Sequence, residues 1–384
     1  MEEFQTHTLP NGLRLIYRPT QSAVSYCGFT VNAGTRDEDE GYSGLAHFVE
    51  HTIFKGTTHR RASHILNRME VVGGELNAYT SKEETVVYSV FPGAHLARAM
   101  QLLGDLVADS QFPERELCKE REVVVDEINS YRDTPSELIY DEFESSLFEG
   151  CSLGRNILGD VDSLTRITSD IARRFLTDYY TPENMVFFFM GSTSFNRVRG
   201  LAERYFGHLC RPKKELSREL KPFVESFSRT VSRDTHQSHV IIGARAYDLF
   251  DKRRRPLLLL NNLWPGYEQR VECEPPGKER VCLYGGVVRD FVYRYGTFYS
   301  LFRDGSSLCS AMYRFGEKGV EKGSRAKAFA GEVGCGQTSV YGADRGFYRS
   351  FGECGVGFGK EFPPLRSFRF FGGDCVFDGA DYGR

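Results

Sequence analysis

Residues 44–52 read Gly44-Leu-Ala-His47-Phe-Val-Glu50-His51-Thr52, with two histidines four positions apart and a glutamate directly before the second. On a helix, positions four apart lie on one face and a position three along borders that face, so both imidazoles and the carboxylate converge. Two imidazoles and a nearby carboxylate oxygen suit a catalytic zinc, which takes three protein ligands and keeps a fourth position open. The alternative is that the two histidines are structural and are satisfied by neighbouring groups.

The chain before this helix is predicted to form strands. Asn11-Gly12 stands between alternating apolar runs, which indicates a hairpin over residues 6–19. Residues 24–31 contain aromatic and β-branched side chains and form a second predicted strand. The polar turn at residues 32–38 then delivers the chain to the histidine helix.

Candidates for a further ligand lie on a long, charged helix predicted over residues 114–131. Glu120 and Glu127 are seven positions apart, and two helical turns bring them to nearly the same face. Charge-rich helices usually face solvent, but the apolar run at residues 123–125 favours partial burial of this one. Glu122 is the competing glutamate, although two positions along a helix turn it nearly opposite to Glu120.

The remaining periodic segments predict scaffold. The predicted helices are residues 63–72, 95–110, 169–180 and 195–206, and the predicted strands are residues 85–90 and 184–190. Residues 209–233 are charged and lack an apolar period, which is typical of a linker. Residues 234–263 then repeat the opening pattern, because a strand beginning at Ser238 echoes residues 25–34 and an apolar helix at residues 255–262 takes the place of the histidine helix.

Composition bounds the class of protein. A chain of 384 residues is expected to form two domains, and its net charge of −3 with interspersed signs predicts no nucleic-acid partner. The N-terminal residues lack the basic and apolar regions of a signal peptide, and no apolar run reaches the ~20 residues that span a bilayer. The four cysteines before residue 264 show no paired spacing, which fits reduced thiols. We therefore expect a cytoplasmic protein without a membrane segment.

The character of the chain changes at Trp264. All ten isoleucines precede this residue, whereas 22 of the 39 glycines and six of the ten cysteines lie in the last 121 residues. These residues show no sustained helical or alternating period. The change falls inside a predicted helix, which indicates a shift of reading frame and predicts an out-of-frame, poorly ordered tail over residues 264–384.

The order His-x-x-Glu-His inverts the motif of common metalloproteases and is typical of inverzincins. From about Thr6 to Leu263 the chain resembles the pitrilysin/insulinase family, which includes the mitochondrial processing peptidases. The resemblance implies an α+β fold of duplicated two-layer half-domains, each an antiparallel sheet with helices. Here it implies a zinc peptidase half-domain over residues 1–208, a linker at residues 209–233, and a truncated second copy without the metal motif at residues 234–263.

The resemblance also implies roles for single residues. The family's third ligand is a glutamate some 75 residues after the second histidine, and 75 residues separate His51 from Glu127. His47, His51 and Glu127 would thus hold one Zn²⁺ per chain, with Glu50 as general base toward a zinc-activated water and Glu120 as an acid supporting a ligating histidine.

Asn77-Ala78 resembles a pair on the family's edge strand, to which a peptide substrate adds as a further strand. The residues alone favour a plain turn before the strand at residues 85–90. Main-chain pairing at an edge gives affinity that does not depend on the sequence of the peptide.

The implied function is that of a zinc metalloendopeptidase acting on peptides or small unfolded polypeptides, as a monomer or as a homo- or heterodimer with a related subunit. The rival is a non-catalytic structural or binding subunit. With one choice of synonymous codons, residues 264–269 read one base later spell Gly-Pro-Gly-Met-Asn-Ser. The codons that follow can spell an Arg and a Tyr that resemble the pair with which the family's second half closes over substrate. The chain as written lacks that pair, so we expect a weak or inactive peptidase.

Overall fold

The computed structural model describes residues 4–212, 214–218, 227–233, 238–248, 250–253, 255, 286–291 and 296–304. The chain divides into two units, Met1–Arg314 and Phe315–Arg384, and the second lies outside the described residues. Among the described residues, no helix combines the length and the apolar character needed to cross a membrane.

The first half of the chain is built on a six-stranded sheet. Its order is β1 (Gln5–Thr8), β2 (Arg14–Pro19), β6 (Met185–Gly191), β3 (Val24–Val31), β5 (Thr85–Pro92) and β4 (Glu75–Thr80). The hairpin predicted at Asn11-Gly12 is confirmed by the antiparallel pairing of β1 with β2. The sheet is not wholly antiparallel as predicted, because β6 pairs in parallel with β2. Since a long stretch of helices and strands separates β2 from β6 in the sequence, β6 can return in the direction of β2.

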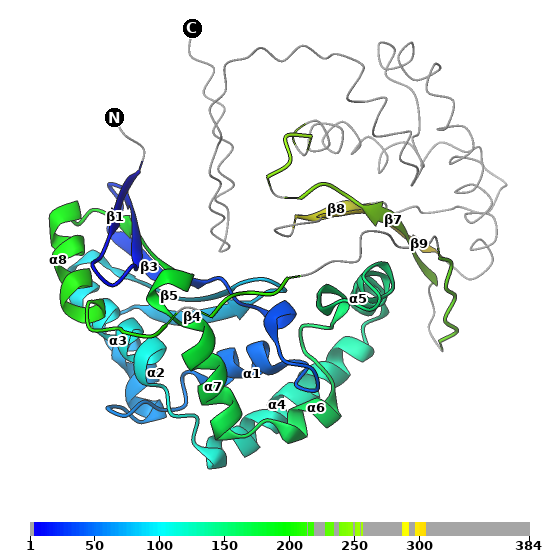
Figure 1. Ribbon diagram of the computed structural model, residues 1–384, viewed down its shortest axis with the longest axis horizontal. Coiled ribbons are helices and arrows are strands. Elements are labelled where there is room, and N and C mark those ends of the chain that lie inside the picture. The colour runs from blue at the N-terminus through cyan, green and yellow to red at the C-terminus, as the bar shows by residue number, and fades with distance from the viewer. Residues whose placement is uncertain are drawn as a thin grey trace, which may run out of the picture. The chain divides into compact units, whose positions relative to one another are not determined.

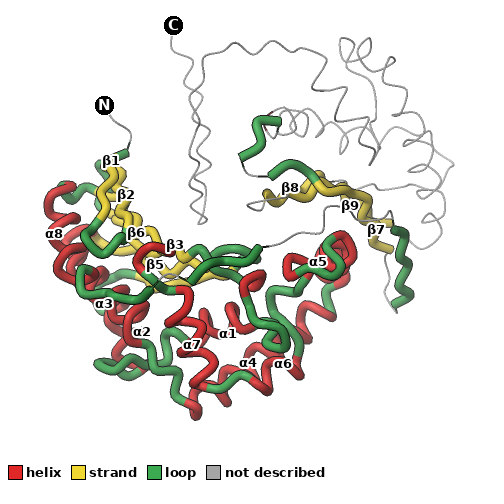
Figure 2. Tube along the Cα trace, in the orientation of Figure 1, coloured by secondary structure: helices red, strands yellow, loops and turns green. Residues whose placement is uncertain are grey.

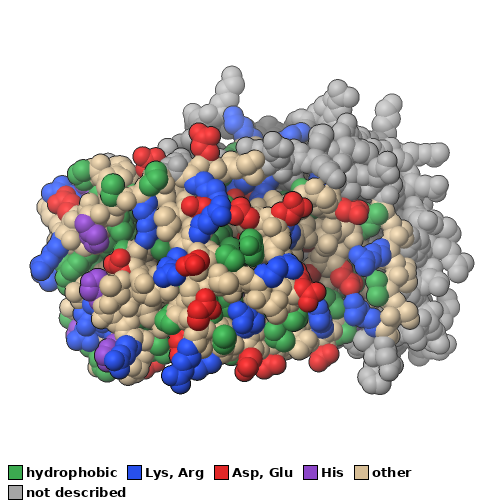
Figure 3. All heavy atoms as spheres, turned by 60° about the horizontal axis from the view of Figure 1, so that its bottom comes forward, with side chains coloured by type: hydrophobic (Ala, Val, Ile, Leu, Met, Phe, Trp, Pro, Cys, Tyr) green, Lys and Arg blue, Asp and Glu red, His purple; other side chains and the backbone are tan. Residues whose placement is uncertain are grey.

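Helices cover one face of this sheet, giving two layers (Figure 1). They are α1 (Leu45–Thr52), α2 (Ala62–Glu70), α3 (Leu96–Asp109), α4 (Glu114–Arg132), α5 (Pro135–Leu147), α6 (Val161–Arg166), α7 (Ser169–Tyr179) and α8 (Phe195–Phe206). Figure 2 shows the loops that link these helices to the strands. Acidic and basic side chains are interspersed over the face seen in Figure 3, in keeping with the mixed charge of the sequence.

The core lies between sheet and helices. Phe29 of β3, Phe187 of β6 and Phe206 of α8 are fully buried, and the ring of Phe206 lies 4.8 Å from each of the other two between centroids. Burying an aromatic side chain of this size stabilises the fold by about 1.5–3 kcal/mol. This packing explains why the apolar strand predicted at residues 184–190 occupies a central position.

The segment that follows α8 departs from the linker prediction over its first ten residues. Arg211 donates to the carbonyl oxygens of Val107 and Tyr180, at 3.0 and 3.2 Å. Arg218 is 5% exposed and bonded to residues of the first half. Long-range arginine contacts of this kind leave no local apolar period, so the sequence pattern did not reveal them.

A second sheet contains β7 (Ser238–Arg245), β9 (Gly296–Asp304) and β8 (Gly286–Phe291), paired antiparallel in that order. β7 confirms the strand predicted from Ser238. β8 and β9 lie beyond Trp264, where we predicted few regular elements, and their short Val-Val and Phe-Tyr-Ser-Leu-Phe runs were the available signal. The predicted helix at residues 255–262, apart from residue 255, and the rest of the tail lie outside the described residues.

Candidate metal centre

The histidine helix α1 begins at a tightly fitted position. Gly44 precedes it with φ 87°, and a side chain there would meet the carbonyl oxygen of Leu158 at 2.6 Å. The buried carboxyl group of Glu38 accepts hydrogen bonds from the main-chain nitrogens of Gly44 and Ala46, at 3.0 and 2.8 Å. Glu38 therefore satisfies two of the donors that a helix N-terminus leaves open. Sequence reasoning missed this role, because Glu38 lies six residues before Gly44, outside the helix and its usual capping positions.

Helices α1 and α4 bring three potential ligands together. Nε2 of His47 lies 3.7 Å and Nε2 of His51 3.5 Å from Oε2 of Glu127. The ligand atoms of all three residues lie within 4.8 Å of one another. Tetrahedral zinc with ligands at 2.0–2.2 Å holds neighbouring ligand atoms about 3.3–3.6 Å apart. The donor types and their spacing therefore fit a zinc ion.

Glu120 stands behind His51, on the side away from Glu127. Its Oε1 lies 3.1 Å from Nδ1 of His51, and its Oε2 lies 2.6 Å from the ammonium nitrogen of Lys55. Burial alone would raise the pKa of Glu120, but the hydrogen bonds from His51 and Lys55 lower it overall. An ionised Glu120 can hold His51 with its proton on Nδ1 and its Nε2 lone pair toward Glu127. Glu122, the competing glutamate, is exposed.

The pKa values of the two imidazoles shift in opposite directions. Burial, with a further contribution from His51, lowers the pKa of His47 to about 3, so this ring is neutral, as a metal ligand must be. Burial alone would lower the pKa of His51, but Glu120, Glu50 and Glu127 together raise it. Nδ1 of His47 is buried and has no hydrogen-bond partner among the described residues, in contrast to Nδ1 of His51.

Glu50 lies beside the three candidate ligands. Its Oε2 is 3.9 Å from Nε2 of His47, and its side chain is 13% exposed. Burial raises the pKa of Glu50 to about 7, against a lowering by His51. The Thr80 hydroxyl has no partner at ordinary hydrogen-bond distance within the described part of the chain, but its proximity to Glu50 also lowers that pKa. A carboxylate with a pKa near neutrality is suited to accept and return a proton.

Asn77 and Ala78 lie on β4, the last strand in the sheet order, which packs against α1. The prediction of an edge strand is confirmed, and the alternative of a plain turn is wrong. The Ala78 nitrogen donates to the side-chain oxygen of Asn77 at 2.8 Å, so this N–H is not used in pairing with β5. An added strand can use such an N–H.

A second group of possible ligands, His59, Asp105 and Asp109, also lies close together. Asp105 is already bonded to the Thr57 hydroxyl at 2.8 Å, to His59 Nδ1 at 3.0 Å and to Arg60. These contacts satisfy both carboxylate oxygens and tie the loop after α1 to α3. We assign the group a structural role.

Comparison with known families places these residues in context. The sequence model of the insulinase family (peptidase family M16) matches residues 14–161, and the model of the peptidase M16 inactive domain matches residues 166–302. The first match contains every candidate site residue. The second passes Trp264 and ends within β9, so similarity to the family continues beyond the point where we predicted a change of frame.

Individual relatives agree with these matches. The uncharacterized zinc protease YmxG of Bacillus subtilis is 33% identical over 262 residues, which are 68% of this chain and 63% of the relative. The probable mitochondrial-processing peptidase subunit beta of Arabidopsis thaliana is 33% identical over 208 residues, 54% of this chain and 39% of the relative. The chain thus spans less than two thirds of the length of these relatives.

Solved structures support the fold. A protease from Helicobacter pylori superposes with a TM-score of 0.75 at 21% identity, covering 84% of this chain and 80% of that protein. A putative M16-like peptidase from Alicyclobacillus acidocaldarius gives a TM-score of 0.70 at 18% identity, covering 86% of this chain and 84% of that protein. At these identities the likeness concerns the fold alone.

Proposed function

Because the chain belongs to the insulinase family (peptidase family M16), we propose that it is a zinc metalloendopeptidase of the inverted His-x-x-Glu-His type. One zinc ion per chain is held by His47, His51 and Glu127. The observation that carries this proposal is the convergence of these three side chains from α1 and α4, with Glu50 beside them. The similarity to relatives known as zinc proteases supports the choice of metal.

Each residue has a defined task in this mechanism. Zinc, when bound, polarises the scissile carbonyl and acidifies the attacking water. Glu50 takes the proton of that water and passes it to the leaving amine, which a carboxyl with a pKa of about 7 can do in both directions. Glu120 orients the His51 ring through Nδ1.

Substrate is held by main-chain pairing with β4. A peptide or small unfolded polypeptide lies along the open edge at Asn77 and Ala78, next to α1. Such pairing requires an extended chain and little particular sequence, because the bonds involve the backbone. We therefore assign unfolded peptides, rather than folded proteins, as the substrate class.

A non-catalytic subunit is the second candidate. The match of residues 166–302 to a domain described as inactive, and the similarity to one subunit of a processing peptidase, favour it. A subunit that only binds or supports a partner needs neither the three ligands nor Glu50, and their joint presence favours the peptidase. Under either candidate, the chain can pair with a second copy or with a related subunit.

Zinc content and hydrolysis of a fluorogenic unstructured peptide, measured for the full chain and for Glu50→Gln, test the proposal. We expect about one zinc per chain in both proteins. Hydrolysis by the natural chain should be slow, and Glu50→Gln should lower it by roughly 10²- to 10⁴-fold. Equal rates in the two proteins would show that Glu50 is not the base. Zinc binding without hydrolysis by the natural chain would favour the non-catalytic subunit.

A further inference from the structure

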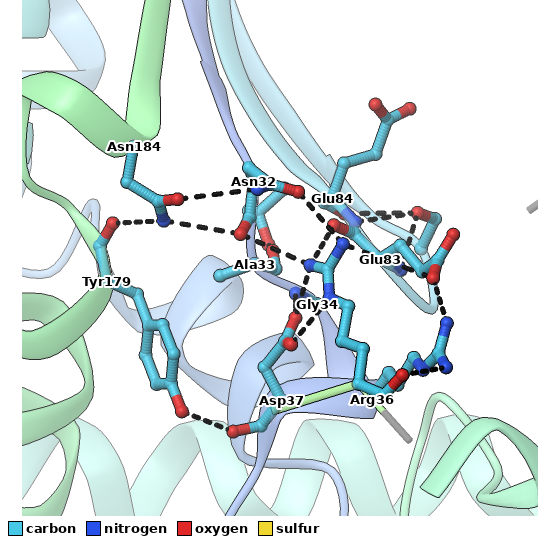
Figure 4. A network of polar contacts seen from close by, with 12 residues as sticks. Asn32, Ala33, Gly34, Arg36, Asp37, Glu83, Glu84, Tyr179 and Asn184 are labelled. Carbon is cyan, nitrogen blue, oxygen red and sulfur yellow. Dashed lines mark hydrogen bonds and ion pairs between the residues drawn. The ribbon is translucent and has the colours of Figure 1, made fainter. Parts of the chain in front are cut away.

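Two turns near the metal centre are joined through their backbones. The first, η1 (Thr35–Asp37) with its flanking residues, leads from β3 toward α1, and the second, residues 81–84, connects β4 to β5. The main-chain nitrogen of Thr35 donates to the carbonyl oxygen of Ser81 at 3.2 Å. The main-chain nitrogen of Arg36 donates to the carbonyl oxygen of Lys82 at 2.8 Å. Figure 4 shows the polar side chains that surround this junction.

Four charged side chains are gathered at the junction. Arg36 and Glu83 form an ion pair between the two turns. Arg218 donates to both carboxylate oxygens of Asp37, from Nε at 2.8 Å and from a terminal nitrogen at 2.7 Å. The same arginine also donates to the Glu83 carbonyl oxygen at 3.0 Å. Arg36, Glu83 and Arg218 are 2%, 8% and 5% exposed, so each charge depends on its partners in place of water.

Only Arg218 comes from outside the first sheet and its helices. It lies twelve residues after the end of α8, in the segment that sequence analysis assigned as a linker. Its carbonyl oxygen also accepts a hydrogen bond from Arg36 at 3.2 Å. The segment between the two halves therefore supplies both a cation and an acceptor to a buried site of the first half.

The junction lies between the two components that act on substrate. On one side, β4 ends at Thr80, next to the 81–84 turn, and carries the open edge at Ala78. On the other side, the first turn continues to Glu38, which holds the N-terminus of α1 and so positions Glu50. A peptide carbonyl meets Glu50 only if strand and helix keep a fixed separation.

We propose that Arg218 is a positioning residue for peptide hydrolysis, which locks the β4–β5 turn to the turn preceding α1 and so aligns the substrate edge with Glu50. This inference rests on the proposed peptidase function. The zinc ligands lie on α1 and α4 and none on β4, so loss of the lock should misplace the peptide and leave the metal in place.

The test compares full-length Arg218→Met and Arg218→Lys with a matched control, Arg211→Met. Arg211 belongs to the same segment and is also docked, but its bonds go to carbonyl oxygens of Val107, Ala108, Leu176 and Tyr180, away from both turns. For each protein, kcat, KM, zinc affinity and melting temperature are measured. Affinity for a fluorescein-labelled unstructured peptide is measured on a Glu50→Gln background, which prevents turnover.

We expect Arg218→Met to retain the zinc affinity of the natural chain and to lose about tenfold or more in kcat, because misplacement near 1 Å can cost 10²-fold. Its peptide affinity should fall as well. Arg218→Lys should restore only part of the loss, since lysine cannot bond both oxygens of Asp37. Arg211→Met should lower the melting temperature without changing kcat or peptide affinity well below that temperature.

Several results would overturn the inference. Kinetics of Arg218→Met equal to those of Arg211→Met would make Arg218 merely structural, and parallel loss of zinc would place its effect on the metal centre instead. If Arg218→Met does not fold, Asp37→Asn removes the charge with little change of shape and must show the same kcat loss. If the natural chain binds zinc but does not hydrolyse peptide, the proposed function fails, and peptide affinity still decides the role of Arg218.

Discussion

Oε1 of Glu120 lies 3.1 Å from Nδ1 of His51, on the opposite side of the ring from the Nε2 that faces Glu127 at 3.5 Å. His51 is thus held between two carboxylates with different tasks. The Glu120 side chain is 11% exposed and paired with Lys55, whereas the Glu127 side chain is 34% exposed. This difference in exposure fits the proposed roles, in which the more buried carboxylate orients the ring and the more accessible one binds the metal.

Replacement of Glu120 by Gln should weaken zinc binding by about 10- to 100-fold, because outer partners of ligating histidines typically contribute that much to metal affinity or activity. The amide can still accept a bond from His51, but it lacks the charge and the Lys55 ion pair. Competition with a chromogenic chelator measures the affinity. Glu122→Gln on the exposed side of α4 is the control and should bind zinc normally. Equal affinities for the two variants would remove Glu120 from the site.

Replacement of Glu127 by Ala should leave the chain with much less than one zinc after dialysis, because one of the three proposed protein ligands is gone. Its side chain is partly exposed, so the apo forms of the variant and the natural chain should melt at similar temperatures. Metal analysis and thermal unfolding provide the two readouts. Asp126→Asn, at the exposed neighbouring position, is the control. Full zinc content in Glu127→Ala would show that the third ligand lies elsewhere.

Local patterns in the sequence predicted most of the first half and placed the candidate site residues on their elements, whereas the choice of Glu127 as third ligand came from the family resemblance. The i, i+3, i+4 spacing of His47, Glu50 and His51 and the two-turn spacing of Glu120 and Glu127 follow from helix geometry alone, and the structure brings these residues together. Asn11-Gly12 predicted its hairpin for a similar reason. In these cases the information lies within a few residues of the chain.

Features that depend on distant contacts were not predictable in this way. The parallel pairing of β2 with β6 joins residues about 170 positions apart in the sequence. Arg218 meets Asp37 across a separation of 181 positions. Glu38 reaches α1 through a loop that has no helical period. A single sequence carries no local pattern for such contacts, because many pairings satisfy the same charges and carbonyl groups.

The stability of the chain should depend on pH through Glu38. Burial raises the pKa of Glu38 to about 8, although bonds from Ala46 and Gly44 lower it in part. The ordinary value is 4.5, so the folded state binds an additional proton between these two pH values. Because the unfolded state binds fewer protons in that range, the free energy of unfolding contributed by this group falls as pH rises from 4.5 to 8.

Urea unfolding of zinc-saturated protein across this range tests the effect. Glu38→Gln cannot ionise, so the difference in unfolding free energy between the natural chain and the variant should change with pH by up to about 1.4 kcal/mol per unit. Effects of zinc and of other titrating groups are common to both proteins and cancel in the difference. A difference that stays constant from acid to mildly alkaline pH would mean that Glu38 is ionised in the fold.

The coding DNA across Leu263 tests the reading-frame prediction. The composition of the tail predicts one inserted or deleted base in comparison with related genes, because isoleucine is absent after this point while glycine and cysteine become frequent. The family match to residue 302 and strands β8 and β9 favour an intact frame at least that far. Sequencing of an independent isolate of the gene distinguishes a shifted reading frame from an intact one. A frame that agrees with relatives through codon 263 and beyond would reject the shift.

Ala78→Pro should weaken peptide binding at the open edge of β4. Proline removes the N–H that now bonds only to the Asn77 side chain, and proline is tolerated on an edge strand where the N–H faces away from the sheet. Loss of one main-chain hydrogen bond to the peptide should raise KM by roughly three- to tenfold. The values of kcat and zinc content should be retained, because that bond stabilises the ground state and the transition state equally. Ala78→Ser keeps the N–H and is the control. The same comparison on a Glu50→Gln background measures peptide affinity directly, so slow turnover does not limit it. Unchanged affinity in Ala78→Pro would move the substrate from this edge to another surface.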